Sequence, residues 1–450
     1  MDIKDINREY MDLILNRQED YHEDYKFTIE RVKHSKARSR DMPAPFLYQP
    51  YFINEENLRD FKRIIVTMVS INNKVTRKYI EDKAFRRKFG FPKLIEELIE
   101  VDNVYDINVP IGRFDIFYED FDNFKFCEIN TDGASGMNED NALARILLET
   151  KGMKDFAKRY KLEYFELIDS WVDHSIDIYR SYDETNNSPN VAIVDFAESG
   201  ITADFQAYKA AYLAKGYNCI IVDPRDLEYR DGGLYHGDYR IDLVYRRIVT
   251  FELIEKAEEI PDFIEAYRNQ AFCCIGSIRS QVVHNKIYFK VLHDEDTLEI
   301  LTEEERAFVK KHIPMTGIFG GDDGVFDLVL NNKDKFIMKP MDLNASQGVY
   351  VGKDLSMEEW EARLRKDWNN QYLYQEFVDT YSREYLVFKD GQFQAEDFSA
   401  VVGLFVFREE FAGTHIRIGQ SNVISGVTDY YTAPGIFVDK LLLLKNLRHQ

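Results

Sequence analysis

Hydrophobic residues in the first hundred positions recur at steps of three and four, with charged residues between them. Phe61, Ile64, Ile65 and Met68 show this spacing most clearly. Such a spacing puts apolar side chains on one face of an α-helix. We therefore expect residues 1–100 to form a helical N-terminal region, and no pattern of chemically active residues occurs in it.

The pattern changes to short alternating runs in IGRFDIFYEDFDNFKFCEINTDG, residues 111–133. Alternation with a period of two predicts two strands, joined by a polar turn at 119–124. Helical spacing returns over 139–180. We take residues 101–189 as one unit, built from this hairpin and the helices that follow it.

A βαβ unit is predicted after the polar loop SYDETNNSPN. The run VAIVDFAESG has the continuous apolar character of a buried parallel strand, and a helix over about 203–215 separates it from the strand NCIIVD. The segment 241–245, IDLVY, is a third candidate strand. Residues 190–275 are thus expected to form a small α/β domain with its functional edge at the carboxyl ends of the strands.

Residues 276–450 are predicted to be rich in strands, with helices between them. The fold class that follows is mixed α/β, with α+β character in this last part. Lys389-Asp390-Gly391 lies between two alternating runs and predicts a tight hairpin. The predicted strands are FDLVL, KFIMKP, GVYVG, YLYQEFV, EYLVFKDGQFQAEDFSAVVGLFVF and THIRIG.

Composition narrows the range of functions. The chain has 450 residues, 45% of them hydrophobic, and a net charge of −21. A surplus of carboxylates opposes the phosphate contacts that general nucleic-acid binding requires. The four cysteines lack the spacing of a zinc site, and no run of apolar residues is long enough for a membrane span. We expect a cytoplasmic protein without nucleic-acid or membrane partners, and no feature of the sequence sets its oligomeric state.

The predicted hairpin carries the first candidate site. Asp115 on one strand, with Glu128 and Asn130 on the next, would place three oxygen-bearing side chains on one face. Hard oxygen ligands of this kind suit Mg²⁺, whose remaining positions are filled by water and substrate phosphates. A capped turn, in which Asn130 and Asp132 bond to the backbone, accounts for the same residues.

Two lysines form the second candidate. Lys339 ends a predicted strand, and Pro340 then turns the chain into the small-residue loop MDLNASQG. A lysine beside such a loop can contact a phosphate that the backbone N–H groups cover. Lys286 is its candidate partner. The Walker motif is absent, and a solvated lysine at the end of a strand is the alternative.

The third candidate is the strand end Gln375-Glu376-Phe377, followed later by Arg417. Mixed polar and apolar residues at the end of a strand can hold adenine through backbone groups and ribose through a carboxylate. Arg417 would point from its strand toward an anion. Charges on an edge strand are the alternative explanation for both.

The order and type of these motifs resemble the ligase domain of glutathionylspermidine synthase. That family has a circularly permuted ATP-grasp fold, with eukaryotic glutathione synthetase as a more distant relative. The resemblance extends over about residues 111–438. The motifs that carry it are Arg113-Phe114-Asp115, Glu128-Ile129-Asn130, Asn285-Lys286, Lys339-Pro340, Tyr374-Gln375-Glu376-Phe377, and Ala412-Gly413 with Ile416-Arg417.

The resemblance implies roles for the metal and phosphate residues. In the family the corresponding acids and amide bind two Mg²⁺ ions, which assigns Asp115, Glu128 and Asn130 to the metal. The family's lysines contact the phosphates of ATP, which assigns Lys286 and Lys339. ATP and Mg²⁺ are therefore the expected cofactors.

Adenine and ribose are held in the family by the segment that here reads Gln375, Glu376 and Phe377. The family arginine that matches Arg417 binds the transferred phosphate and the acyl phosphate, so Arg417 is the expected electrostatic catalyst. Arg113 matches a second arginine at the reaction centre.

Substrate residues follow from the same resemblance. Thr131 and Ser135 lie in the loop that corresponds to the family's peptide site. Glu198 stands where the family has two adjacent acids for a polyamine, and Thr250 and Glu252 fall near substrate-lining positions. A single acid in place of a pair leaves the identity of the amine open.

The implied activity is an ATP-dependent carboxylate–amine ligase that forms an amide through an acyl phosphate. The carboxylate is a small molecule or peptide, with a polyamine as one candidate amine. We expect no amidase domain before residue 113 and hence synthetic activity only. Met341–Gly348, with Asn344, Ala345 and Ser346, would form a lid over the phosphates. Alternatives are a ligase for a different acid and amine, in a natural-product or peptide-modification pathway, and a non-catalytic nucleotide-binding scaffold.

Overall fold

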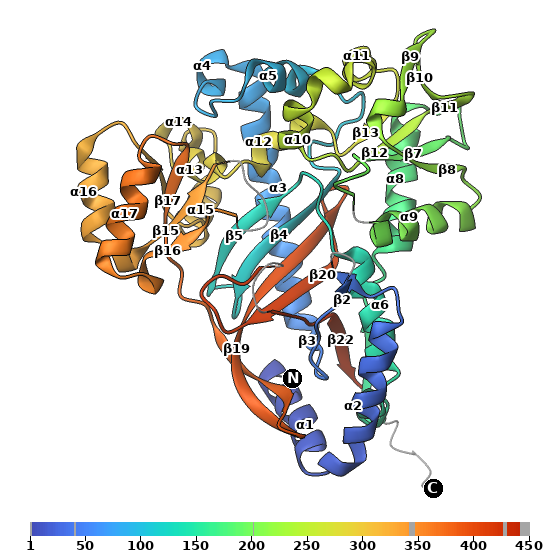
Figure 1. Ribbon diagram of the computed structural model, residues 1–450, viewed down its shortest axis with the longest axis vertical. Helices are drawn as coiled ribbons and strands as arrows, with labels where there is room; N and C mark the ends of the chain where they lie inside the picture. The colour runs from blue at the N-terminus through green and yellow to red at the C-terminus, as the bar shows by residue number, and fades with distance from the viewer. Residues whose placement is uncertain (1, 40–41, 201, 342–346, 426–429, 442–450) are drawn as a thin grey trace, which may run out of the picture.

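The computed structural model describes residues 2–39, 42–200, 202–341, 347–425 and 430–441. These residues form a mixed α/β protein, as predicted from the sequence. Helical and strand-rich parts are arranged around a central antiparallel sheet (Figure 1).

The central sheet has the strand order β21-β20-β19-β4-β5, and β18 pairs with one end of β19. Both predicted hairpins are present. Asp390 and Gly391 have φ angles of 52° and 83°, the left-handed values that a tight two-residue hairpin turn requires. The strands are β4 (Ile111–Tyr118), β5 (Phe124–Asn130), β18 (Ser382–Lys389), β19 (Gln392–Phe407), β20 (Glu410–Gly419) and β21 (Tyr431–Thr432).

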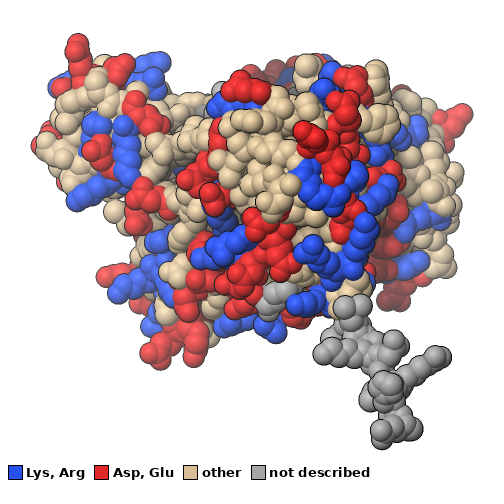
Figure 2. Space-filling view, turned by 90° about the horizontal axis from the view of Figure 1, so that it is seen from below, with Lys and Arg blue, Asp and Glu red and all other residues tan. Residues whose placement is uncertain are grey.

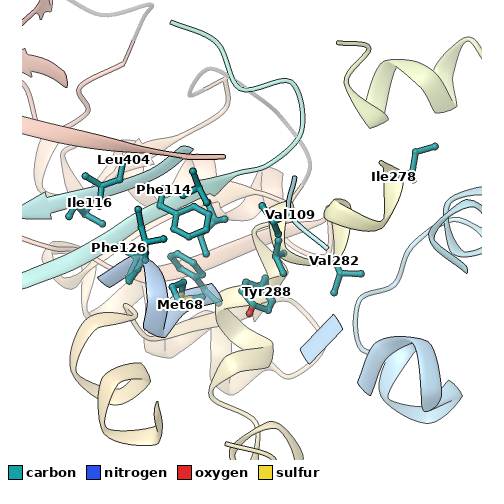
Figure 3. Close-up of a cluster of buried hydrophobic side chains, with 14 of the residues drawn as sticks. Met68, Val109, Phe114, Ile116, Phe126, Ile278, Val282, Tyr288 and Leu404 are labelled. Carbon is teal, nitrogen blue, oxygen red and sulfur yellow. The ribbon is translucent and has the colours of Figure 1, made fainter. Parts of the chain in front are cut away.

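One face of the central sheet packs on the long helix α3 (Glu55–Glu81), which lies behind the sheet in Figure 1. Phe114 and Leu404 are cross-strand partners on this face, and they meet Met68 of the helix in a buried cluster (Figure 3). The helix is amphipathic because its apolar residues recur at helical spacing, as the sequence predicts. The opposite face of the sheet carries polar residues and, toward one end, the buried aromatic residues Phe405 and Phe407.

A second sheet holds the predicted βαβ unit. Its strands are all parallel, in the order β13-β12-β7-β8. Arg246 at the carboxyl end of β12 donates to Asp132 in the loop that follows β5. The elements are β7 (Val191–Val194), α9 (Thr202–Ala214), β8 (Cys219–Val222), β12 (Leu243–Arg246), α10 (Thr250–Glu255), α11 (Pro261–Arg268) and β13 (Cys273–Ile275), with the small sheet β9 (Glu228–Arg230), β10 (Gly233–His236) and β11 (Tyr239–Ile241) beside them.

A third sheet, of order β14-β17-β15-β16, forms a separate lobe with two helices (Figure 1). The predicted strand FDLVL is wrong, because Phe326–Leu330 lies inside helix α16. Asp322 caps that helix by accepting from the Gly324 N–H, and Val329 is buried against the sheet. The elements are β14 (Thr316–Phe319), α16 (Asp323–Asn331), β15 (Phe336–Pro340), β16 (Tyr350–Val351), α17 (Met357–Asp367) and β17 (Tyr372–Glu376).

The N-terminal region is helical, as predicted, with three short strands. The helical stretch predicted over 139–180 is interrupted by strand β6, whose backbone pairs with β22 in the sheet β3-β22-β6. The elements are α1 (Ile3–Leu15), α2 (Gln18–Lys33), β1 (Arg38–Ser39), β2 (Met42–Pro43), β3 (Tyr51–Ile53), α6 (Met137–Leu148), α7 (Lys151–Phe156), β6 (Tyr160–Tyr164), α8 (Ile168–Tyr182) and β22 (Gly435–Lys440).

Short helices join these parts. They are α4 (Lys83–Arg86), α5 (Lys93–Glu100), α12 (Gln281–His284), α13 (Ile287–Leu292), α14 (Glu295–Leu298) and α15 (Glu303–His312).

Among the described residues, no helix combines the length and apolar character needed to cross a bilayer. All four cysteines are free thiols. Acidic and basic side chains are intermingled over the face drawn in Figure 2, so the net charge of −21 does not gather there into a patch of one sign.

Candidate functional site

The polar face of the central sheet collects residues from four strands. Register sets this arrangement: Gly403 of β19 lies between Asp115 of β4 and His415 of β20. Side chains of directly opposed residues point to the same face, and so do residues two apart on one strand. Arg113 and Arg417 therefore share this face.

Asp115 is the centre of a charge cluster on that face. Its side chain is fully buried, and Arg113 binds both carboxylate oxygens, with Nε–Oδ1 at 2.7 Å and Nη2–Oδ2 at 3.0 Å. Arg417 donates from Nη2 to Oδ2 over 2.6 Å. Asn130 donates to the same oxygen at 3.2 Å and to Glu128 Oε1 at 3.0 Å. The amide of Asn130 thus lies within hydrogen-bonding distance of both carboxylates predicted from the sequence.

A bulge in β5 aims Glu128 at this cluster. Asp115 pairs with Glu128 while Ile116 pairs with Phe126, which leaves Cys127 as the extra residue. A bulge of this kind rotates the chain and re-aims a side chain. Phe126 therefore packs into the core with Ile116, whereas Glu128 faces Asp115.

Glycine at position 403 makes room for the cluster. A Cβ atom there would lie 2.8 Å from Asp115 Oδ1, 2.8 Å from Arg113 Cδ and 2.7 Å from the His415 carbonyl oxygen. These separations are shorter than van der Waals contact. The ion pair between Arg113 and Asp115 can therefore lie flat across β19 only because residue 403 has no side chain.

The charge of Glu128 is strongly stabilised. Burial works to raise its pKa, but Lys286, Arg417, Asn130 and Lys339 together outweigh that effect and lower the pKa to about 2. Glu128 is thus a carboxylate at any physiological pH. Because both candidate lysines lower this pKa, both must lie near Glu128, although they come from distant parts of the chain.

Two cavities meet at this cluster and share Glu128 and Arg417 as walls. The first, which we call the polar cavity, has a volume of about 250 Å³. It lies over the central sheet between β20, the N-terminal end of α6 and α9. The second has a volume of about 70 Å³ and lies between the central sheet and the β14–β17 lobe. We call it the nucleotide cavity because the residues predicted from the sequence to bind ATP line it.

The nucleotide cavity brings together most of the residues predicted for ATP. Apolar side chains from both sheets line it, including Phe126, Ile337 and Val401. Lys339 Nζ donates to the Cys127 carbonyl at 3.2 Å and so reaches from β15 to β5. The predicted residues that line this cavity are Glu128, Lys286, Lys339, Gln375, Glu376, Phe377 and Arg417.

Gln375 and Glu376 have different environments at the end of β17. Gln375 donates from Nε2 to Thr316 Oγ1 at 2.9 Å, a buried contact with the neighbouring strand. Glu376 is more exposed and accepts from the Met315 N–H at 3.3 Å, with Lys125 Nζ at 3.7 Å. The Phe377 N–H donates to the Lys335 carbonyl. This segment is therefore held on both sides by backbone contacts.

The residues predicted for the substrate are spread more widely. Ser135 lines the polar cavity, and its carbonyl oxygen accepts from Arg113 Nη1 at 2.7 Å. Thr131 is buried and donates to the Ser280 carbonyl at 2.9 Å. Thr250 is buried at the start of α10, where its N–H donates to Asp132. Thr131 and Thr250 do not line either of the two cavities.

Glu198 and Glu252 also lie outside the linings of these two cavities. Glu198 pairs with Arg225 at 2.6 Å and with Lys256 at 2.8 Å, and Glu252 pairs with Lys256 at 2.7 Å. The carboxylates are thus already compensated by cations of the chain. The loop residues Asn344, Ala345 and Ser346, predicted as a lid, lie outside the described residues.

Sequence reasoning missed the residues that anchor the loop after β5. Asp132 forms a buried ion pair with Arg246 at 2.8 Å, and Arg247 donates to the carbonyls of Gly133 and Ala134 at 2.9 and 2.7 Å. Both arginines stand at the end of β12, so the small parallel sheet holds the loop that lines the polar cavity. The two adjacent arginines after the predicted strand IDLVY were the sequence feature that could have indicated this role.

Three further polar-cavity residues were missed: Glu139, Asp204 and His415. Burial raises the pKa of Glu139 to about 7; the hydrogen bond from Thr432 opposes this shift and Asp204 adds to it. Burial also raises the pKa of Asp204 to about 6, against the attraction of Arg247. Burial lowers the pKa of His415, and Arg113 and Arg417 lower it further. The alternation of His415 with Arg417 on one strand was a signal for the histidine.

Metal-binding capacity is restricted to mixed oxygen ligands. No group of three or more His, Cys, Asp and Glu side chains suited to a metal occurs in the described part of the chain. Asp115 and Glu128 supply two carboxylates, and Asn130 supplies an amide. Such hard donors fit Mg²⁺ bound together with phosphate oxygens and do not form an all-protein cage.

Comparison with known proteins leaves the family open. No known protein family matches the chain, and no curated protein matches it. Among solved structures, a putative gamma-glutamylcysteine synthetase from Methylobacillus flagellatus KT aligns with a TM-score of 0.40 and 10% identity, over 81% of this chain and 87% of that one. A likeness of this size establishes neither a shared fold nor a shared activity, so the function is argued from the site alone.

Proposed function

We propose that this protein is an ATP-dependent carboxylate–amine ligase with a permuted ATP-grasp fold, similar in activity to glutathionylspermidine synthase. The observation that carries the proposal is the meeting of two cavities at Glu128 and Arg417. One is narrow, partly apolar and lined by two lysines; the other is wider and polar. A nucleotide and two small substrates need two adjoining cavities of this kind, one for the nucleotide and one for the substrates.

The nucleotide cavity has the features that ATP requires. A base can lie against the apolar residues from the two sheets, while Glu376 at its edge is available to ribose hydroxyls. Lys286 and Lys339 face the phosphate end beside Glu128. Two lysines provide positive charge where an acidic protein would otherwise repel a triphosphate.

Asp115, Glu128 and Asn130 are the proposed Mg²⁺ ligands. Glu128 is ionised, and the Asn130 amide is within hydrogen-bonding distance of both carboxylates, so the three side chains fit a shared hard cation. Mg²⁺ bound there would reduce the charge on the phosphate oxygens and orient the terminal phosphate. Asp115 gives up its contact with Arg417 in this arrangement, which frees the guanidinium for the transferred phosphate.

Arg113 and Arg417 are the proposed electrostatic catalysts. A substrate carboxylate attacks the γ-phosphate to give an acyl phosphate and ADP; an amine then attacks the acyl carbon and phosphate leaves. Negative charge develops on the phosphate and then on the carbonyl oxygen. Buried guanidinium groups next to the reacting atoms stabilise that charge, which is how most of the catalysis in phosphoryl transfer is achieved.

The same site would serve a ligase that joins a different acid and amine, so the substrates are the variable part of the proposal. A non-catalytic scaffold is the alternative from another class. The presence of both lysines, both arginines and the three oxygen ligands around one point argues against a scaffold, which has no need for a charged reaction centre.

A screen for ADP release tests the proposal. The full-length protein, ATP and Mg²⁺ would be offered a panel of thiol peptides, amino acids and other carboxylates, first with hydroxylamine and then with polyamines and other amines. Hydroxylamine converts an acyl phosphate into a hydroxamate, which a ferric reagent detects. Hydroxamate with at least one acid supports the ligase. ATP binding without ADP or hydroxamate from any acid would establish the scaffold instead.

A further inference from the structure

Two buried carboxyl groups in the polar cavity form no ion pair among the described residues, although Arg417 attracts Glu139 and Arg247 attracts Asp204 from beyond ion-pair distance. Glu139 lies near the start of α6 and Asp204 near the start of α9, and their residues are 6% and 2% exposed. The hydrogen bonds that they receive in the described part of the chain come from neutral groups. Thr432 donates to Glu139, and the Gly136 N–H donates to Asp204 at 3.5 Å. Buried carboxylates without a cation are costly, because burial removes the water that stabilises their charge.

The contrast with other acids at the site is sharp. Asp115 is compensated by Arg113 and Arg417, and Asp132 by Arg246. On the α/β domain, Glu198 and Glu252 share Lys256. Glu128 also lines the polar cavity and is assigned to Mg²⁺ in the proposed function. Glu139 and Asp204 are thus the remaining carboxyl groups of this cavity that form no ion pair among the described residues.

His415 provides an independent indication of a ligand. Its side chain is 6% exposed and lines the polar cavity, yet its Nδ1 atom has no hydrogen-bond partner. The nearest acidic atom is Asp140 Oδ1 at 3.9 Å, which also lacks a partner. An unsatisfied buried nitrogen on a residue that lines a polar cavity costs free energy unless a bound molecule or water completes its hydrogen bonds.

The polar cavity also borders the proposed reaction centre. Arg113 and Arg417 line it, and both are close enough to Glu139 to alter each other's ionisation. A molecule bound in this cavity meets the acids Glu139 and Asp204 as well as Arg38, Arg113 and Arg417. An amine held by the two acids would thus lie in the same cavity as the arginines proposed to bind the phosphorylated carboxylate.

We propose that the polar cavity is the binding site of the amine substrate, a primary amine that enters as an ammonium ion held by Glu139 and Asp204, with the imidazole of His415 beside it. The role of this amine as a nucleophile rests on the proposed ligase function, whereas the ammonium site stands on its own geometry. The assignment moves the amine from Glu198 and Glu252 to the cavity that adjoins Arg417.

Binding of a simple cation tests the site without any activity. n-Butylammonium chloride would be titrated into the full-length protein in a calorimeter at about pH 8, where a primary amine is still protonated. n-Butanol, of the same shape without the charge, is the ligand control. We expect butylammonium to bind and butanol not to bind. Glu139→Gln and Asp204→Asn should each weaken the binding about tenfold or more, since each removes one charged contact.

Glu258→Gln is the matched control, because Glu258 is an exposed acid far from both cavities. Its affinity for butylammonium should equal that of the unaltered protein. The two test substitutions lie on different helices, and thermal unfolding checks that each variant is folded. Equal binding of butylammonium and butanol, or unchanged affinity in both folded variants, would overturn the proposal.

Hydroxylamine separates this proposal from the proposed function. Hydroxylamine is neutral at this pH and needs no ammonium site, so hydroxamate formation by the unaltered protein reports on the ligase chemistry independently of butylammonium binding. Butylammonium binding with no hydroxamate from any acid would refute the ligase and keep the cation site. Hydroxamate formation without butylammonium binding would refute the amine site alone.

Discussion

Arg417 and Asp115 are 302 positions apart in the sequence, yet Arg417 Nη2 lies 2.6 Å from Asp115 Oδ2. The contact joins β20 to β4 across β19, and it lies where the polar cavity and the nucleotide cavity share a wall. A substitution at this contact should therefore lower the rate of turnover without weakening nucleotide binding.

Replacement of Arg417 by alanine should leave ATP binding intact and lower turnover on the order of 10² or more, because the guanidinium acts on charge that develops during the reaction. Asp115 keeps its two contacts with Arg113 in the variant, which limits the damage to the fold. Hydroxamate formation measures turnover, and calorimetry measures ATP binding.

Arg365→Ala is the control for that substitution, since Arg365 is exposed on α17, where it pairs with Glu361 of its own helix and lies over the Phe326 ring, and it lines neither of the two cavities. It should behave as the unaltered protein in both assays. A near-normal rate of hydroxamate formation in Arg417→Ala would remove this residue from the chemistry.

A methyl group at residue 403 should disrupt the site from within the sheet. Gly403→Ala places Cβ 2.8 Å from Asp115 Oδ1, so the Arg113–Asp115 pair must shift. Overpacking of this kind costs about 1–3 kcal/mol. We expect a lower free energy of unfolding in urea together with loss of hydroxamate formation.

Gly324→Ala provides the comparison for that variant. Gly324 is in the first turn of α16, and the nearest atom to its added Cβ is a carboxylate oxygen of Asp322 at 3.2 Å. Alanine favours a helix more than glycine does, so stability should be equal or slightly higher. If Gly403→Ala unfolds at the same urea concentration as the unaltered protein and stays active, the flat ion pair across β19 is not required.

The sequence predicts the hairpin that carries Asp115 and Glu128, because alternation is a local property of each strand. It does not reveal the bulge at Cys127, which depends on how the two strands pair. Nor does it reveal that residue 403 separates Asp115 from His415, since the register of strands so distant in the sequence is set by the packed sheet. The arrangement of these residues in one site could therefore be recognised only in the structure.

Local pattern also explains where the prediction of secondary structure failed. FDLVL has the composition of a strand, but Asp322 before it is a helix cap, and Val329 is buried with Trp360 of α17. A cap and an apolar stripe outweighed the β-propensity of the valine and the phenylalanine. The polar-cavity acids were overlooked for a related reason: Glu139 and Asp204 look like ordinary first-turn helix residues until burial is known.

Lys339→Ala should weaken ATP binding about tenfold, because the ammonium group at the phosphate end of the nucleotide cavity is lost. Calorimetric titration with ATP in the presence of Mg²⁺ gives the dissociation constant. Lys335→Ala, at an exposed position just before the same strand, is the control and should bind as the unaltered protein. Equal affinities in the two variants would show that Lys339 is a solvated lysine at a strand end.

The stability of the protein should depend on pH through Glu139. Burial raises the pKa of this carboxyl from 4.5 to about 7, so the folded state favours its protonated form. The stabilisation that results is fully present below pH 4.5 and is lost as the pH rises to about 7. The shift of the pKa corresponds to about 3 kcal/mol over that interval.

Glu139→Gln removes this ionisation while glutamine can still accept the hydrogen bond from Thr432. The difference in the free energy of unfolding between the variant and the unaltered protein should therefore rise by about 3 kcal/mol from pH 4.5 to pH 8, in favour of the variant. Asp204, Asp140, His415 and Arg417 also face Glu139, but they are present in both proteins and largely cancel in the difference. Urea unfolding of both proteins from pH 4.5 to pH 8 measures this difference in the free energy of unfolding. Parallel pH curves for the two proteins would mean that Glu139 ionises in the folded state as it does in water.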